Sequence, residues 1–114
     1  MFDFEKLLIY QKAKLFRKEV NIICANSPAD KVIINQLRRA ALSIPLNIAE
    51  GTSRYSKADR RNFYVISRGS VIECVAALDM LHDDGFVSTD IFKNRYTQGE
   101  ELSKMLYSMI QKLN

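Results

Sequence analysis

The chain has 114 residues, of which 47% are hydrophobic and 26% are charged, and its net charge is +4. These proportions exclude a disordered or fibrous protein, and the length fits a single domain spanning residues 1–114 with a core of its own. Only four Gly and two Pro interrupt the chain, which favours helix. No apolar stretch is long enough for a signal peptide or a membrane span, so we expect a cytoplasmic protein with no membrane partner.

Basic residues are concentrated in the middle of the chain. Residues 30–72 carry a net charge of +5, and the remaining residues sum to −1. The excess is mainly arginine, which suits phosphate recognition but serves solubility equally well. The charge pattern therefore raises the expectation of a nucleic-acid partner only modestly.

Cysteine and histidine usage gives little sign of metal or redox chemistry. Cys24 and Cys74 lie in apolar runs without CxxC spacing, which favours buried free thiols. Asp79, His82 and Asp83 fall within one helical turn, but no fourth ligand is evident, and a solvated helix end is the favoured interpretation. We expect no metal and no cofactor.

The first half of the chain predicts two helices. Apolar residues recur at steps of three and four over residues 4–26, and the run stops before Pro28. Asp30 is the predicted N-cap of a second helix, whose period continues through Pro45 to Gly51, the predicted C-terminal signal. Because proline has no N–H for the preceding turn and crowds it, a bend or a substitute donor is expected there.

The second half predicts two more helices. Ser56 is the predicted N-cap of the third, Gly85 its left-handed end, and Ser88 or Thr89 the cap of the fourth. The inward stripe predicted for the third helix contains small residues, which implies a close approach to a neighbour: Phe63, Ser67, Ser70, Cys74, Ala77 and Leu81. Four long helices with short connections predict an all-α fold, an antiparallel up-down-up-down four-helix bundle.

Polar residues follow one flank of the second helix and a matching flank of the third. We predict that they form a structural hydrogen-bonded network between the two helices: Arg39, Ser43, Asn47, Glu50, Ser70 and Glu73. The alternative is that these residues are the solvated margins of two amphipathic helices.

Several apolar residues fall outside the inward stripes of the same two helices: Leu42, Pro45, Leu46, Ala49, Tyr64, Val65, Ile72 and Val75. A lone bundle would expose them, so self-association is predicted. The residues assigned to the oligomer interface are Leu42, Leu46, Val65 and Ile72. A wider core, or scattered exposed apolar side chains, is the alternative.

The stretches QLRRAALSIPLNIAEG (36–51) and RYSKADRRNFYVISRGSVIE (54–73) resemble the bacterial family of 23S rRNA intervening-sequence proteins, which includes the accessory variability determinant of diversity-generating retroelements. FEKLLIYQKA (4–13) and ELSKMLYSMIQKL (101–113) extend the resemblance. It implies a ring-shaped homo-oligomer, with a pentamer as the expected form, association with nucleic acid or ribonucleoprotein, and no established enzymatic activity. The matching positions are Arg38, Arg39, Ser43, Asn47, Glu50, Gly51, Ser70 and Glu73.

Three functions compete. The first is a non-enzymatic homo-oligomer that binds nucleic acid, RNA before DNA, through Lys14, Arg17, Arg38, Arg61 and Arg68, with Tyr55 and Tyr64 as further contact candidates. The second is a protein-interaction scaffold for a ribonucleoprotein, a polymerase such as a reverse transcriptase, or a ribosomal component, without direct nucleic-acid binding.

The third is an enzyme that uses Arg39, Asn47, Glu50 and Glu73. Against it, the sequence has no nucleophile beside a base, no phosphate loop and no metal-ligand array. We therefore assign no catalytic residue and expect the protein not to be an enzyme.

Overall fold

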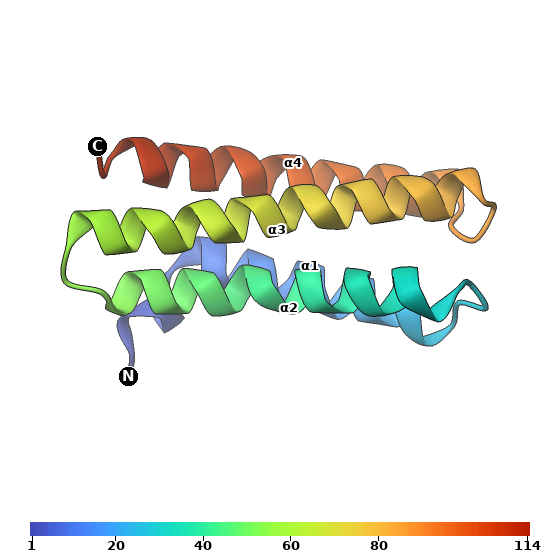
Figure 1. Cartoon of the computed structure of the whole chain (residues 1–114), viewed down its shortest axis with the longest axis horizontal. Coiled ribbons are helices and arrows are strands. Elements are labelled where there is room, and N and C mark those ends of the chain that lie inside the picture. The colour runs from blue at the N-terminus through green and yellow to red at the C-terminus, as the bar shows by residue number, and fades with distance from the viewer.

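The computed structural model describes all residues, 1–114, and consists of helices without strands. A short 3₁₀ helix, η1 (Asp3–Lys6), precedes α1 (Leu8–Ala25), α2 (Lys31–Ser53), α3 (Lys57–Asp83) and α4 (Thr89–Gln111). The four long helices alternate in direction and form a bundle of 44 × 24 × 22 Å, with both termini and the α2–α3 connection at one end (Figure 1). The predicted all-α antiparallel four-helix bundle is confirmed.

Polar caps begin three of the helices where the sequence predicted them. The Asp30 side chain accepts a hydrogen bond from the Val32 amide at 2.7 Å, and Ser56 accepts one from the Asp59 amide at 3.0 Å. Ser88, the first of the two residues proposed for the fourth helix, is its N-cap. Gly85 has a φ of +83°, which is the left-handed geometry expected after α3.

Two predicted helix boundaries are wrong. The first helical run is not continuous from residue 4, because Leu7 is extended and separates η1 from α1. Here the Glu5 carboxylate accepts a hydrogen bond from the Phe2 amide, which favours a separate short turn. Gly51 does not end α2, which continues to Ser53.

The buried face of α3 is rotated relative to the predicted stripe. Ser67, Cys74, Ala77 and Leu81 are buried as predicted, but Phe63 and Ser70 are only half-buried. Their places in the core are taken by residues one position further along the chain, Tyr64 and Val71, together with Leu78. Tyr64, which was expected outside the core, is therefore buried, and Pro45 on α2, also expected outside, is buried as well. The hydrophobic period therefore predicts the spacing of the buried residues of α3, but it does not predict which of two adjacent residues, such as Phe63 or Tyr64, faces the core.

Ion pairs join α1 to α4. The Lys12 ammonium lies 2.5 Å from the Glu101 carboxylate, and the Arg95 guanidinium lies 2.5 Å from Glu19.

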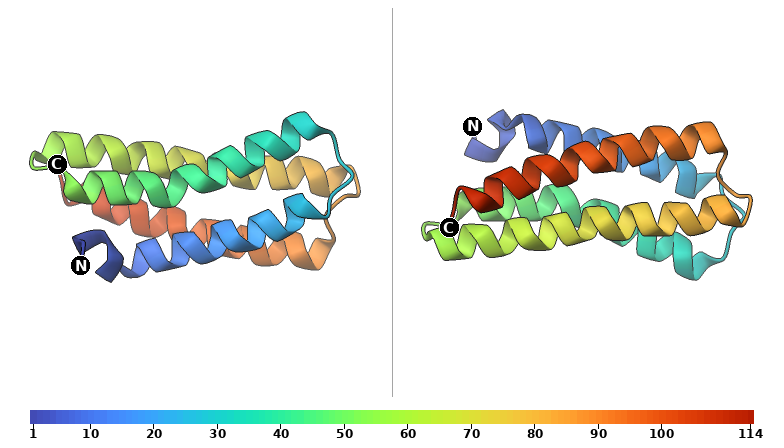
Figure 2. Two further views of the ribbon diagram at one scale, coloured as in Figure 1. Left: turned by 90° about the horizontal axis from the view of Figure 1, so that it is seen from below. Right: turned by 90° about the horizontal axis from the view of Figure 1, so that it is seen from above.

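Seen from opposite sides, the α1–α2 pair lies in front in one view and the α3–α4 pair in the other (Figure 2). The α1–α2 pair and the α3–α4 pair thus form two opposite faces of the bundle. None of its helices is apolar enough over sufficient length to cross a bilayer.

Candidate assembly and nucleic-acid interfaces

Hydroxyl groups join α2 and α3 along their contact. Ser67 is fully buried, and its Oγ donates to the Ile44 carbonyl at 2.9 Å, directly before Pro45. A substitute donor was expected for the Ala41 carbonyl, which Pro45 cannot bond. Ser67 is a side-chain donor beside the proline, but it bonds the Ile44 carbonyl instead. Ser70 Oγ donates to Ser43 Oγ at 2.8 Å on the adjacent turn. The two helices are therefore held in register by short polar side chains, which permit close approach.

The structure brings together three of the six residues predicted for the polar network. Asn47 Nδ2 donates to Ser43 Oγ at 2.8 Å, and Ser43 in turn accepts from Ser70. Glu50 instead pairs with Arg54 on the same helix at 3.1 Å and is exposed. The network is thus smaller than predicted, and within it the Ser70–Ser43 bond joins α3 to α2 while the Asn47–Ser43 bond lies within α2.

The other two predicted members lie elsewhere. Arg39 borders a groove between α1 and α2, and Glu73 borders a groove with Gln36 and Asp30 near the opposite end of the bundle from Glu50. Because Ser70 bonds Ser43 across the antiparallel pair, Glu73 and Glu50 are about ten residues apart in level, which is roughly 15 Å along the bundle axis. They cannot act as a carboxylate pair on one substrate atom, so the geometry gives the enzyme hypothesis no support.

Gly51 has a packing role that its sequence position did not reveal. A Cβ at this position would lie 2.7 Å from Tyr64 Cε1 and 3.1 Å from Phe63 Cβ. Tyr64 cannot move away freely, because its hydroxyl donates to Thr52 Oγ1 at 2.9 Å while Thr52 donates to the Ile48 carbonyl. The absence of a side chain at Gly51 lets α2 and α3 meet closely near the α2–α3 connection.

One broad face, the α1–α2 face, combines exposed apolar side chains with basic ones. A groove of about 780 Å³ runs between the two helices, and no acidic residue lines it. The exposed apolar residues along it are Leu15, Ile22, Leu42 and Leu46. Its basic neighbours, including those of the adjoining hollow, are Lys14, Arg17, Lys18, Arg38 and Arg39. Arg17 Nε is buried and has no hydrogen-bond partner within the chain.

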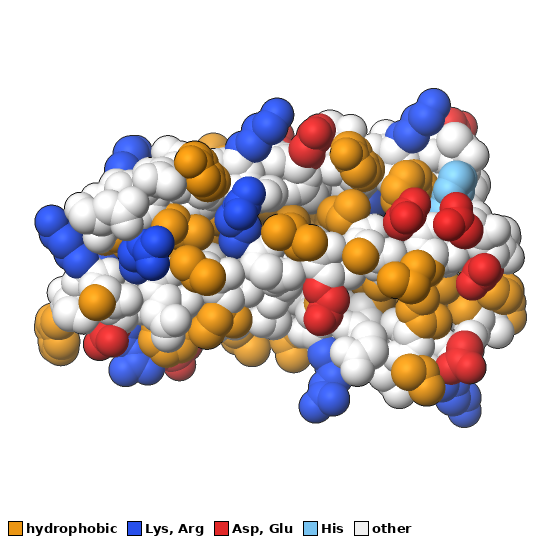
Figure 3. All heavy atoms as spheres, turned by 45° about the horizontal axis from the view of Figure 1, so that its top comes forward, with side chains coloured by type: hydrophobic (Ala, Val, Ile, Leu, Met, Phe, Trp, Pro, Cys, Tyr) orange, Lys and Arg blue, Asp and Glu red, His pale blue; other side chains and the backbone are white.

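On the opposite face, the α3–α4 face, the groove is apolar and acidic. This groove of about 420 Å³ is lined by Ile72, Phe92, Tyr96 and other residues, and its only charged lining residues are Asp79 and Glu100. A Cβ at Gly99 would lie 2.6 Å from Val75 Cγ2, so the two helices approach closely beneath the groove. In Figure 3, hydrophobic side chains lie along this side of the bundle, Lys and Arg predominate towards its left end, and Asp and Glu towards its right end.

The predicted interface residues divide between these two faces. Leu42 and Leu46 lie on the α1–α2 face and are 40% and 54% exposed. Ile72 lies on the α3–α4 face and is 54% exposed, and Val65, two turns earlier on α3, is 43% exposed. The four residues therefore do not form one patch, and their separation was not predicted.

The predicted nucleic-acid contacts divide in the same way. Lys14, Arg17 and Arg38 border the α1–α2 face. Arg61 and Arg68 lie towards α4: Arg61 Nε donates to Asn114 Oδ1 at 2.9 Å, and Arg68 Nε donates to the Ser103 carbonyl at 3.2 Å. A single cationic patch made of all five residues is not present.

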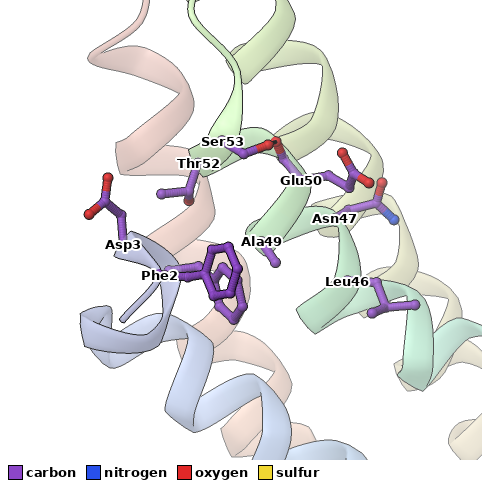
Figure 4. Close-up of a pocket in the computed structure, with 9 residues that line it drawn as sticks. Phe2, Asp3, Leu46, Asn47, Ala49, Glu50, Thr52 and Ser53 are labelled. Carbon is purple, nitrogen blue, oxygen red and sulfur yellow. Dashed lines mark hydrogen bonds between the residues drawn. The ribbon is translucent and has the colours of Figure 1, made fainter.

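A further hollow of about 520 Å³ lies between η1 and the end of α2. The Phe2 ring, 71% exposed, projects towards Ala49, whereas Asn47 and Glu50 leave α2 on the side away from it (Figure 4). Phe2 and Leu46 together make this hollow partly apolar.

The two cysteines are free thiols in the core. Burial, helped by the nearby Glu73 charge and by Cys24, raises the pKa of Cys74 to about 12. Burial also raises the pKa of Cys24, while Arg38 opposes part of that rise. Neither thiol is an activated nucleophile.

His82 contacts Thr89 Oγ1 at 3.1 Å and stacks on Phe92. No group of three His, Cys, Asp or Glu side chains is placed to hold a metal ion, and Asp79 instead borders the α3–α4 groove.

These features define a small all-α protein whose distinctive parts are a tightly joined α2–α3 pair and two dissimilar exposed faces. A family model described as 23S rRNA-intervening sequence protein matches residues 5–108, and the chain belongs to this family. The sequence resemblance is thereby confirmed. Among curated proteins, none matches this sequence.

A solved structure has the same fold. It is a protein of unknown function from Bacteroides thetaiotaomicron that is assigned to the S23 ribosomal protein family. That protein is 24% identical in sequence to this chain, and the two structures superpose with a TM-score of 0.84. The match covers 90% of this chain and 98% of that one.

Proposed function

We propose that this protein is a non-enzymatic homo-oligomer, a ring with the pentamer as its expected form, that binds nucleic acid. The observation that carries the assembly is the pair of unlike faces on one bundle. Both faces expose large apolar side chains, as association sites do. Because the two faces are different, the contact they favour is head-to-tail, and such a contact forms a ring when the rotation from one subunit to the next closes.

Charge complementarity supports the pairing of these two faces. The α1–α2 groove is lined by several cations and no acid, whereas the charged residues that line the α3–α4 groove are Asp79 and Glu100, with Arg68 beside its Ser103 end. Docking would bring carboxylates towards the basic residues that line the α1–α2 groove, Lys14, Arg17 and Lys18. Lys14, Arg17 and Arg38 would then serve assembly, and nucleic acid would be bound by basic residues that the ring leaves free, Arg61 among them.

Two variants test this arrangement. Leu46→Glu places an acid on the α1–α2 face, and Ile72→Lys places a cation on the α3–α4 face. Both residues are exposed in the single chain, so each variant should keep its fold while losing the ring. Each still has one intact face, so a mixture of the two should form heterodimers. Val32→Glu, at a 71% exposed residue of α2 that lines neither face, is the matched control and should leave the ring unchanged.

Light scattering on the wild type, the variants and their mixture reads out the number of subunits. A wild-type monomer would contradict the proposal. If the mixed variants fail to associate, the contact is not the head-to-tail one described here.

Nucleic-acid binding is tested by titration with RNA and with DNA at several salt concentrations. Each phosphate neutralised on a single strand should contribute roughly 0.7 to the slope of log affinity against log salt. Affinity that does not depend on salt would remove this part of the proposal.

One observation favours the second candidate function, a scaffold for a polymerase or ribosomal protein. The hollow beside Phe2 and Leu46 is partly apolar and both residues are exposed, as apolar residues at a site for another protein are. Loss of partner capture in Phe2→Ala, with salt-dependent RNA binding absent from the wild type, would favour this function over the first.

A further inference from the structure

We propose that the α2–α3 connection is a site for single-stranded nucleic acid, in which an unpaired base stacks on Tyr55 and the neighbouring cations contact phosphates. The site, named here the cationic loop, comprises the connection itself, residues 54–56, and the first turn of α3, residues 57–61, with the joint sequence RYSKADRR. It rests on the proposed function and specifies the kind of nucleic acid that is bound and the place where it binds.

Tyr55 is the most exposed large hydrophobic residue of the chain, with a relative accessibility of 103%. Its ring makes no aromatic or cation–π contact within the chain, whereas neighbouring Arg54 lies 4.8 Å over the Phe63 ring instead. A tyrosine on a protein surface ordinarily lays part of its ring along neighbours. Here both faces of the ring are available to a ligand.

The backbone that carries Tyr55 is fixed on both sides. Arg60 Nε donates to the Arg54 carbonyl at 2.7 Å, and its Nη2 donates to the Thr52 carbonyl at 3.3 Å, so one side chain from α3 ties down the end of α2. Ser56 caps α3 immediately after Tyr55. Because the loop is already ordered, a ligand would not have to pay for ordering the backbone.

The cationic loop contains four basic residues and one acidic residue, Asp59. The basic residues are Arg54, Lys57, Arg60 and Arg61. Internal contacts do not exhaust them. Lys57 forms no ion pair, and Arg54 has only an exposed pair with Glu50, which is weak in water. Arg60 and Arg61 each use part of a five-donor guanidinium. Donors therefore remain for phosphate oxygens.

An exposed aromatic ring among cations fits a single strand better than a duplex or a protein. Bases within a duplex are stacked on one another and offer no free face, whereas unpaired bases stack on aromatic side chains. A protein hot spot is surrounded by residues that exclude water. The residues next to Tyr55 along the chain are polar or charged and exposed, including Ser53, Ser56 and Lys57.

Cyclic symmetry would strengthen the site. In a ring, equivalent points of all subunits lie at the same height along the symmetry axis, so every cationic loop would lie on one rim. A strand that follows the rim would meet several loops at once, and the avidity would exceed the affinity of one loop.

The test compares wild type, Tyr55→Ala and Tyr55→Phe by fluorescence anisotropy with a short labelled oligouridine and with an RNA duplex of the same length. Tyr107→Ala, at another exposed tyrosine, is the matched control. Loss of base stacking should weaken oligouridine binding by about fivefold or more in Tyr55→Ala. Tyr55→Phe and Tyr107→Ala should bind oligouridine as the wild type does, and Tyr55→Ala should leave duplex affinity, the salt slope and the subunit number unchanged.

Wild-type affinity for oligouridine in Tyr55→Ala would overturn this inference and leave the proposed function standing, as would an equal loss for oligouridine and duplex. A wild type that binds neither RNA would remove the inference and the proposed nucleic-acid function together, while the light-scattering result would still decide the assembly.

Discussion

The three glycines that lie within helices provide a test of the close helix contacts. In an ordinary helix interior, Gly→Ala stabilises by about 1 kcal/mol, because alanine loses less backbone entropy. Gly69 lies in α3 with no atom within 4 Å of an added Cβ, so Gly69→Ala should show this full gain. It is the internal standard for the other two substitutions.

Gly51→Ala should have the opposite sign. The new methyl would lie 2.7 Å from the ring of Tyr64, whose hydroxyl is held by Thr52. Overpacking a filled site costs about 1–3 kcal/mol, which exceeds the helix-propensity gain over most of that range. We therefore expect a net destabilisation of about 1 kcal/mol and a difference from Gly69→Ala of about 2 kcal/mol.

Gly99→Ala should resemble Gly51→Ala, because Val75 Cγ2 would lie 2.6 Å from the new methyl and valine is restricted at χ1. The assay is urea unfolding followed by helical circular dichroism, at one protein concentration because assembly contributes to stability. If Gly51→Ala and Gly99→Ala prove as stabilising as Gly69→Ala, the helices do not approach as closely as described and the reasoning is refuted.

Three further outcomes are expected. Ser67→Ala should lower the free energy of unfolding by about 1 kcal/mol, because the buried hydrogen bond to the Ile44 carbonyl is lost; an unchanged urea midpoint would contradict the bond. Ser56→Ala should cost about 1 kcal/mol in the same assay, since the Asp59 amide loses its acceptor, and a neutral result would show that the cap contributes nothing. Cys74 has a folded-state pKa of about 12 against an ordinary value of 9.0, so the thiol ionises in the unfolded chain at a lower pH than in the folded one. The free energy of unfolding is therefore unaffected by this thiol below pH 9 and falls as the pH rises from 9 towards 12. Relative to Cys74→Ala, wild-type stability should fall by about 1.4 kcal/mol per pH unit in that range, and parallel pH profiles would contradict the buried thiol.

The sequence determined the features that depend on neighbours along the chain. The caps at Asp30, Ser56 and Ser88 and the left-handed Gly85 follow from side chains that bond the nearest amides or from a residue without a Cβ. The three-four period likewise fixed the number of helices, and short connections then left an antiparallel bundle as the arrangement.

Only the tertiary structure decided how each helix is turned and what lies opposite it. The hydrophobic period does not distinguish Phe63 from Tyr64 as the buried ring, because the outcome depends on the Thr52 hydroxyl twelve residues away. The sequence around Gly51 likewise predicts a helix end, because it does not show that the Tyr64 ring of α3 lies against this position and leaves no room for a Cβ. The division of Leu46 and Ile72 between opposite faces is a property of the assembled bundle, since it depends on which helices lie beside each one.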